Sequence, residues 1–141
     1  MDTKQSGIRW VRVLVAGLLA EIVTIVVIIL VVTIYNFTIG SGQTEAQKQA
    51  FAAQAGFYVA PIASIVLTFL FAFWVARKVE SKVVLHGTLV GVVATLLSVG
   101  FIFAAQPKAR LMYVASYILK LLSGYAGGVL AQKRLSGVKY G

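Results

Sequence analysis

Two ionisable residues stand alone inside long apolar runs, and their side chains are suited to chemistry. Glu21 lies nine residues past Arg12, and Lys120 lies ten residues past Arg110. At about 1.5 Å per helical residue, both lie roughly 14–15 Å into their runs. A lone carboxylate at such a depth in a membrane costs about 2.5–3.5 kcal/mol, and burial favours its neutral form. Because this group can carry a proton or hold a cation, Glu21 with Thr24 is a candidate proton or cation site. Lys120 is its candidate counter-charge.

The sequence leaves open whether Glu21 and Lys120 pair. Their similar depth favours pairing, but side chains lean toward the N-terminus of their helix. The two helices would run in opposite directions, so these side chains would lean apart. Lys120 would then extend toward Tyr117 or Tyr113 instead. Glu21 has a structural alternative too, as a protonated group that bonds to Ser or Thr and fastens helices together.

The chain has few residues that could form a metal site, a disulfide or a catalytic centre. The chain contains no cysteine, which excludes disulfides and thiolate metal sites. The single histidine, His86, has no acidic residue at ligand spacing, so we predict no metal site and expect a wetted imidazole at the membrane boundary. Neither paired carboxylates nor a Ser/His set is evident. We therefore expect no enzymatic activity and no cofactor.

Four apolar runs must position these residues. Apolar residues make up 60% of the chain and charged residues 12%, whereas a soluble domain has roughly 25% charged residues. Each run approaches the ~20 residues that cross a bilayer as a helix. We predict an all-α membrane protein, a compact antiparallel bundle of four transmembrane helices in a single membrane-embedded domain over residues 1–141. The helices cover about residues 10–35, 56–77, 83–106 and 109–132, with an outer loop over 36–55.

Basic residues alternate between the two ends of the predicted helices. Nine lie in the N-terminal tail, between the second and third helices or after the fourth, and three lie on the other side. By the positive-inside rule we expect both termini to be cytoplasmic. We expect the membrane to be the cytoplasmic membrane of a bacterium or archaeon. The net charge of +9 then reflects orientation and contact with anionic lipid headgroups, and we expect no nucleic-acid binding. The candidate headgroup contacts are Arg9, Arg12, Arg77, Lys78, Lys82, Lys133 and Arg134.

Small residues recur at helical spacing in each run, as expected of packing faces in lipid. They form either the inner faces of the bundle or a mixture of inner face and oligomer contact, so we expect a homo-oligomer or a larger membrane complex. The candidate packing residues are Gly17, Ala20, Ser64, Thr68, Ala72, Gly87, Gly91, Gly124 and Gly128.

Two further patterns concern the arrangement of the helices. Thr44 and Gln47 form a capping box, which predicts either a short surface helix within the outer loop or an extension of the second helix.

An offset of 55 residues aligns Tyr58-Val59-Ala60 with Tyr113-Val114-Ala115. This alignment favours two parallel two-helix repeats and a bundle with pseudo-two-fold symmetry.

The stretch from Leu18 to Thr24 resembles the glutamate-bearing first helix of small multidrug resistance transporters. The resemblance covers seven residues and implies exchange of protons for lipophilic cations at Glu21. The aromatic pattern of that family's second and third helices is absent here, and the outer loop is longer.

Two functional hypotheses follow. The first is a small polytopic membrane protein without enzymatic activity, an accessory or assembly subunit whose small-residue faces pack against other membrane proteins. The alternative is a small oligomeric ion-coupled transporter or channel that uses Glu21. A polar cavity that reaches Glu21 from one side would favour the second hypothesis.

Overall fold

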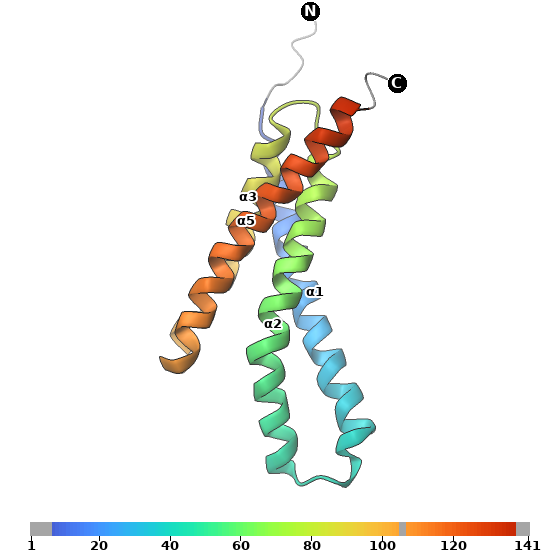
Figure 1. Cartoon of the computed structure of the whole chain (residues 1–141), viewed down its shortest axis with the longest axis vertical. Coiled ribbons are helices and arrows are strands. Elements are labelled where there is room, and N and C mark those ends of the chain that lie inside the picture. Colours follow the sequence, from blue (N-terminus) through green and yellow to red (C-terminus); the bar gives the residue numbers. More distant parts are fainter. Residues whose placement is uncertain (1–6, 105–106, 138–141) are drawn as a thin grey trace, which may run out of the picture.

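The computed structural model describes residues 7–104 and 107–137 and confirms an all-α protein. Four helices are long and apolar enough to cross a membrane, and they pack against one another as a bundle (Figure 1). Both termini lie at the same end of this bundle, which we call the terminal end; the opposite end is the distal end (Figure 1). The elements are α1 (Trp10–Phe37), the 3-10 helix η1 (Ile39–Gly42), α2 (Glu45–Ala76), α3 (Val83–Ser98), α4 (Phe101–Ala104) and α5 (Pro107–Gly137).

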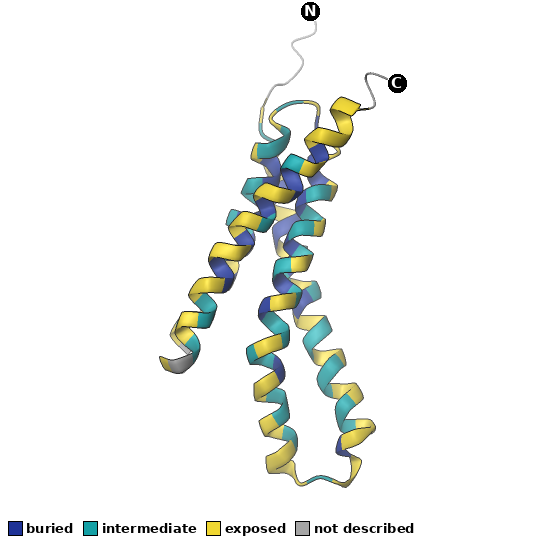
Figure 2. Cartoon of the chain, viewed as in Figure 1, coloured by how far each residue is buried: buried dark blue, intermediate teal, exposed yellow. Residues whose placement is uncertain are grey.

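Helices α2 and α3 each pack against all three of the other long helices, whereas α1 and α5 make little contact with each other. The buried core lies toward the terminal end, around Val13, Ala16, Ala72, Val75 and Val90 (Figure 2). Toward the distal end, α5 diverges from the hairpin of α1 and α2 (Figure 1). The bundle is therefore tightly closed at one end and splayed at the other.

Close approach of backbones closes the terminal end. A Cβ atom on Gly87 would lie 2.6 Å from Gly128 Cα, and one on Gly124 would lie 2.8 Å from the Gly87 carbonyl oxygen. In lipid such contacts drive helix association through packing alone. The predicted packing residues are all buried within this single chain: Gly17, Ala20, Ser64, Thr68, Ala72, Gly87, Gly91, Gly124 and Gly128.

The predicted outer loop is mostly helical. Thr44 caps α2, its side chain accepting from the Gln47 N–H while the Gln47 side chain accepts from the Thr44 N–H at 3.0 Å. Of the two possibilities, the capping box thus extends the second helix, which starts at Glu45 and not near residue 56. Its 32 residues span about 48 Å, more than the ~30 Å of hydrocarbon. Stacking of Tyr35 on Phe51, with ring centroids 3.5 Å apart, joins α1 to this extension.

The predicted helix over 83–106 breaks after Ser98. The Ser98 carbonyl accepts a hydrogen bond from the Tyr117 hydroxyl at 2.6 Å, and the Ser98 hydroxyl bonds to the Ala94 carbonyl at 2.9 Å. Such side-chain bonds compete with the helical ladder. A turn at Val99 and Gly100 follows before the short α4. The last helix runs from Pro107 to Gly137, longer than the predicted 109–132.

The expectation of a wetted imidazole at His86 is wrong, since this side chain is 0% exposed. Its Nε2 atom accepts from the Arg9 N–H at 3.0 Å, and its Nδ1 atom lies 2.9 Å from the Lys82 carbonyl oxygen. Because Nε2 is an acceptor, Nδ1 carries the proton and the ring is neutral. His86 therefore ties the segment before α1 to the start of α3.

The two hairpins, α1–α2 and α3–α5, both start at the terminal end, as a parallel repeat requires (Figure 1). Their diagonal contacts differ, because α2 packs against α3 while α1 and α5 stand further apart. The bundle thus departs from two-fold symmetry where α1 faces α5.

Candidate functional site

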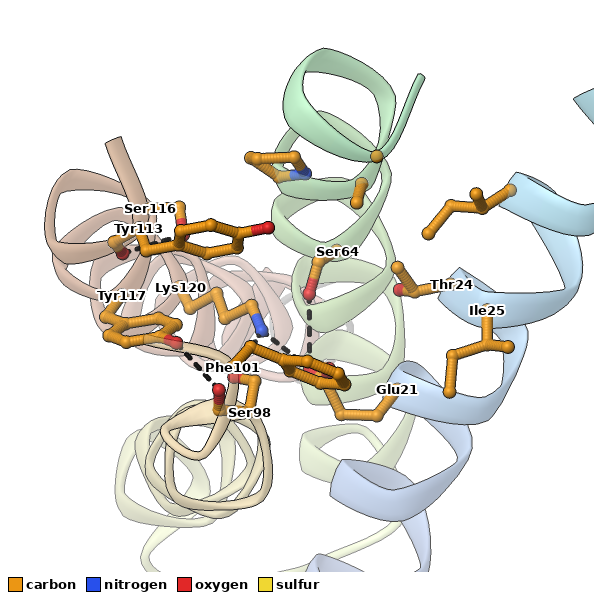
Figure 3. Close-up of a pocket in the computed structure, with 14 residues that line it drawn as sticks. Glu21, Thr24, Ile25, Ser64, Ser98, Phe101, Tyr113, Ser116, Tyr117 and Lys120 are labelled. Carbon is orange, nitrogen blue, oxygen red and sulfur yellow. Dashed lines mark hydrogen bonds and ion pairs between the residues drawn. The ribbon is translucent and has the colours of Figure 1, made fainter. Parts of the chain in front are cut away.

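Glu21 and Lys120 meet across the space between α1 and α5. The Lys120 ammonium nitrogen lies 2.7 Å from Glu21 Oε1. The Lys120 side chain is 3% exposed and the Glu21 side chain 14% exposed. The opposite lean of the two side chains does not prevent the contact, because the lysine stem is long enough to reach across (Figure 3). The structure therefore pairs the two residues whose pairing the sequence left open.

Serines from two further helices complete the ion pair. The Ser64 hydroxyl on α2 donates to Glu21 Oε1 at 3.1 Å, and Lys120 donates to the Ser98 hydroxyl on α3 at 2.7 Å (Figure 3). Tyr117 holds Ser98 from α5 through its bond to the Ser98 carbonyl. Each long helix thus supplies at least one polar side chain. This network satisfies much of the hydrogen-bonding need that makes buried charges costly.

Among the described residues, one oxygen of Glu21 and one N–H of Lys120 have no hydrogen-bond partner, although the Lys120 ammonium also lies 5.7 Å from the centre of the Tyr117 ring. Both hydrogen bonds to Glu21 end on Oε1, and among the described residues Oε2 accepts none. Lys120 donates to two oxygens, one on Glu21 and one on Ser98, whereas an ammonium group has three N–H donors. The Glu21 Oε2 atom is not among the fully buried unpaired atoms of the described part of the chain. Some of its surface is therefore left uncovered by the protein.

A cavity of about 230 Å³ adjoins this pair. Its polar floor contains Glu21, Lys120, Ser64 and Ser98, and most of its remaining wall is apolar (Figure 3). The wall residues beyond the pair on the distal side are Ile25, Ile28, Gly56, Ala60, Pro61, Phe101 and Tyr113. The cavity therefore extends from the ion pair toward the splayed distal end, while the packed core lies on the other side of the pair.

The remaining predicted site residues lie apart from the ion pair. Thr24 lines the cavity, but its hydroxyl donates to the Ala20 carbonyl at 2.8 Å and not to Glu21. The predicted headgroup contacts are all exposed: Arg9, Arg12, Arg77, Lys78, Lys82, Lys133 and Arg134. Three of them have defined side-chain contacts: the Arg77 and Arg134 guanidiniums lie 5.2 and 5.5 Å from the centre of the Phe73 ring, and the Arg12 guanidinium donates to the Lys78 carbonyl oxygen at 3.0 Å.

Ser98 and its partner Tyr117 are the functional residues that sequence reasoning missed. A serine near the end of an apolar run is common, and nothing local marks Ser98 as a lysine partner. The spacing of Tyr117 and Lys120, three residues apart on one helix, predicted that the two side chains meet, and the Lys120 ammonium does lie 5.7 Å from the centre of the Tyr117 ring; the bond from the Tyr117 hydroxyl to Ser98 was not predicted. Within residues 7–104 and 107–137, no three His, Asp or Glu side chains group as metal ligands.

Comparison of the chain with protein-family models, curated proteins and solved structures found no match. The arrangement itself has defined chemical capacities. A carboxylate with one free oxygen can accept a proton or a hydrogen-bond donor from the cavity. An ammonium group with one free N–H can bind an acceptor there. An apolar wall beside these groups suits a ligand with a polar head and an apolar body.

Proposed function

We propose that this protein is a small ion-coupled membrane transporter, with Glu21 as the proton-carrying group and Lys120 as its counter-charge. The observation that carries the proposal is a cavity lined by both Glu21 and Lys120. Ionisable groups within membrane spans are costly, and those that face an internal cavity are typical of proton and ion paths.

The shape of the cavity supports access from one side at a time. Residues that line it lie between the ion pair and the distal end, whereas glycine contacts between α3 and α5 close the terminal end. Under the positive-inside rule the terminal end faces the cytoplasm. The state described here would then be open toward the outside and closed toward the inside. Rocking of α5 against the hairpin of α1 and α2 would exchange the two states.

The accessory-subunit hypothesis has lost its main support. It relied on small-residue faces that were free to pack against other membrane proteins. A Cβ atom on Gly91 would instead lie 2.9 Å from the Lys120 carbonyl oxygen, and one on Gly127 would lie 2.8 Å from the Phe69 carbonyl oxygen. These faces are occupied within the chain, so substituting their glycines would disturb the fold before it disturbed a partner.

Two parts of the proposal concern the surroundings of the bundle. The exposed basic residues at the terminal end suit anionic lipid headgroups, at about 1 kcal/mol for each residue near the surface. Those of Arg12, Arg77 and Arg134 are the best defined of these contacts. A homo-oligomer is part of the proposal. A bundle this small surrounds its cavity with few helices, and neighbouring copies or lipid would have to close the sides of a transport path.

The test uses purified protein in liposomes that contain a pH-sensitive dye. Three pools of small molecules are added outside: organic amines, organic acids and neutral compounds. We expect at least one pool to drive proton movement with the natural chain and none with Glu21→Gln, whose fold is checked by circular dichroism. Glu45→Gln is the matched control, because Glu45 lies on the surface and its side chain bonds to Lys48 at 3.0 Å, far from the cavity lining. Absence of any Glu21-dependent proton movement would refute the proposal.

A further inference from the structure

The floor of the cavity is electrically neutral and offers one acceptor and one donor. The acceptor is Glu21 Oε2, and the donor is the third N–H of Lys120. A ligand head that both donates and accepts would satisfy the two together. A carboxylic acid has this pattern within one small group, because its O–H donates and its carbonyl oxygen accepts.

Charge balance restricts how such a ligand arrives. Adding one net charge to a neutral ion pair at membrane depth is unfavourable. An amine that arrives as a cation must therefore drive a proton from the lysine, and an acid that arrives as an anion must bring a proton for the carboxylate. The carboxylate has one oxygen without a hydrogen-bond partner among the described residues, so it can take a proton without giving up a contact, whereas the ammonium holds two oxygens.

Accessibility favours the same step. The Glu21 side chain is 14% exposed and lines the cavity, whereas the Lys120 side chain is 3% exposed and bonded to two oxygens. Besides this pair, the titratable groups that line the cavity are Tyr113 and Tyr117 on α5; α2 and α3 contribute serines to its polar lining. Among the described side chains, the distal end carries Lys48 and Arg110 against one acid, Glu45, a balance that attracts anions.

The size and walls of the cavity define the rest of the ligand. Its volume of about 230 Å³ exceeds the roughly 150 Å³ that holds benzene in a dry protein cavity. Ile28, Phe101 and Tyr113 present mainly apolar surface. One ring or a short branched chain fits this space, and a highly hydroxylated molecule would leave its polar groups unpaired.

We propose that the cavity binds a weak organic acid with a compact apolar body, as its anion together with one proton. This inference rests on the proposed transport function and names its substrate class. The proton is shared between Glu21 Oε2 and the ligand carboxylate, while Lys120 donates to the ligand. An O–H bond is the only covalent bond that forms, and one proton leaves the solvent for each anion bound.

The test is calorimetric binding of benzoate to the purified protein in lipid nanodiscs between pH 5 and pH 8. Repeating the titration in buffers of different ionisation enthalpy counts the protons. We expect one proton taken up per benzoate and an affinity that falls up to tenfold for each unit of rising pH. Benzylamine and benzyl alcohol, which have the same ring, should bind at least tenfold more weakly at pH 6.

Variants separate the two floor groups. In Glu21→Gln the unpaired Lys120 is uncharged, so a benzoate anion must still bring one proton, which the lysine takes; benzoate binding with proton uptake should therefore persist. Lys120→Met should lose benzoate binding. Ser123→Ala is the control, since Ser123 lies one turn further along α5 and lines a separate groove.

The possible results distinguish this inference from the proposed function. Tighter binding of benzylamine, benzoate binding without proton uptake, or no binding of any of the three probes would overturn the inference. The proton count needs only the natural chain, so a variant that fails to fold does not block the test. Glu21-dependent proton movement driven by the amine or neutral pool would preserve the transport function and refute the acid as its substrate.

Discussion

Removing either member of the ion pair should destabilise the protein, with opposite dependence on pH. Lys120→Met removes the partner that lies 2.7 Å from Glu21 Oε1, so the carboxyl group must take up a proton. Holding a glutamate protonated at pH 7 costs about 3.7 kcal/mol, at 1.36 kcal/mol for each of about 2.7 pH units. In Glu21→Gln the lysine must instead lose its proton, which costs up to about 4.6 kcal/mol.

The burial and remaining hydrogen bonds of each group decide how close the loss of stability comes to these two upper values. Glu21 is 14% exposed and keeps its bond from Ser64, so we expect a loss of about 2–3 kcal/mol for Lys120→Met. Lys120 is 3% exposed, so we expect about 3–4 kcal/mol for Glu21→Gln, within the usual range for a broken buried pair. The combined variant strands no charge and should lie within about 1 kcal/mol of the natural chain.

Proton counts fix the direction of the pH dependence. Folded Lys120→Met holds one more proton than its unfolded chain, so its free energy of unfolding falls as the pH rises, by up to about 1.4 kcal/mol per unit. Folded Glu21→Gln holds one fewer proton, so its free energy of unfolding rises with pH. Unfolding in detergent at pH 5–8, followed by the fluorescence of Trp10 and Trp74, measures both slopes. Equal slopes, or a double variant weaker than both single variants, would refute the assignment of a buried charge pair.

Three further predictions concern single contacts. Gly124→Ala should lower the free energy of unfolding in detergent by about 1–3 kcal/mol, because its Cβ would lie 2.9 Å from Gly91 N and the two helix backbones must separate. Gly56→Ala is the control, since its Cβ would meet no atom within 4 Å and the free energy of unfolding should not change. Equal losses for the two variants would contradict the close approach of the backbones at Gly124. Tyr117→Phe removes the 2.6 Å bond to the Ser98 carbonyl and should lower the unfolding free energy by about 0.5–1.5 kcal/mol. Tyr113→Phe, whose hydroxyl has no described partner, should leave it unchanged. Thr44→Ala removes the cap of α2 and should lower the free energy of unfolding by about 1 kcal/mol. Backbone amides in the first turn after Glu45 should also exchange hydrogen faster, and those elsewhere should not. Exchange in that turn as slow as in the natural chain would show that the cap contributes nothing.

Much of the fold could be predicted because its causes are local in the sequence. An apolar run of about 20 residues is long enough to predict a membrane span. The start of α2 depends on a four-residue capping box, from Thr44 to Gln47. Glu21 and Lys120 also stood out locally, since a charge within an apolar run is costly. The break at Ser98 and the burial of His86 could not be predicted in this way. Their causes are partners distant in the chain, Tyr117 at 19 residues and Arg9 at 77 residues.

Local patterns in the chain were enough to predict a bundle of membrane-spanning helices with two charges inside it. The hydrophobicity of a residue and the cost of burying its charge depend on that residue and its near neighbours, so both can be judged without a three-dimensional structure. The meeting of Glu21 and Lys120 across 99 residues of chain came from the packing of the helices. The same packing also places a cavity beside them. The reason is that glycine contacts hold α3 and α5 together at the terminal end while α5 diverges from α1 and α2 at the other, and no residue encodes such a balance alone.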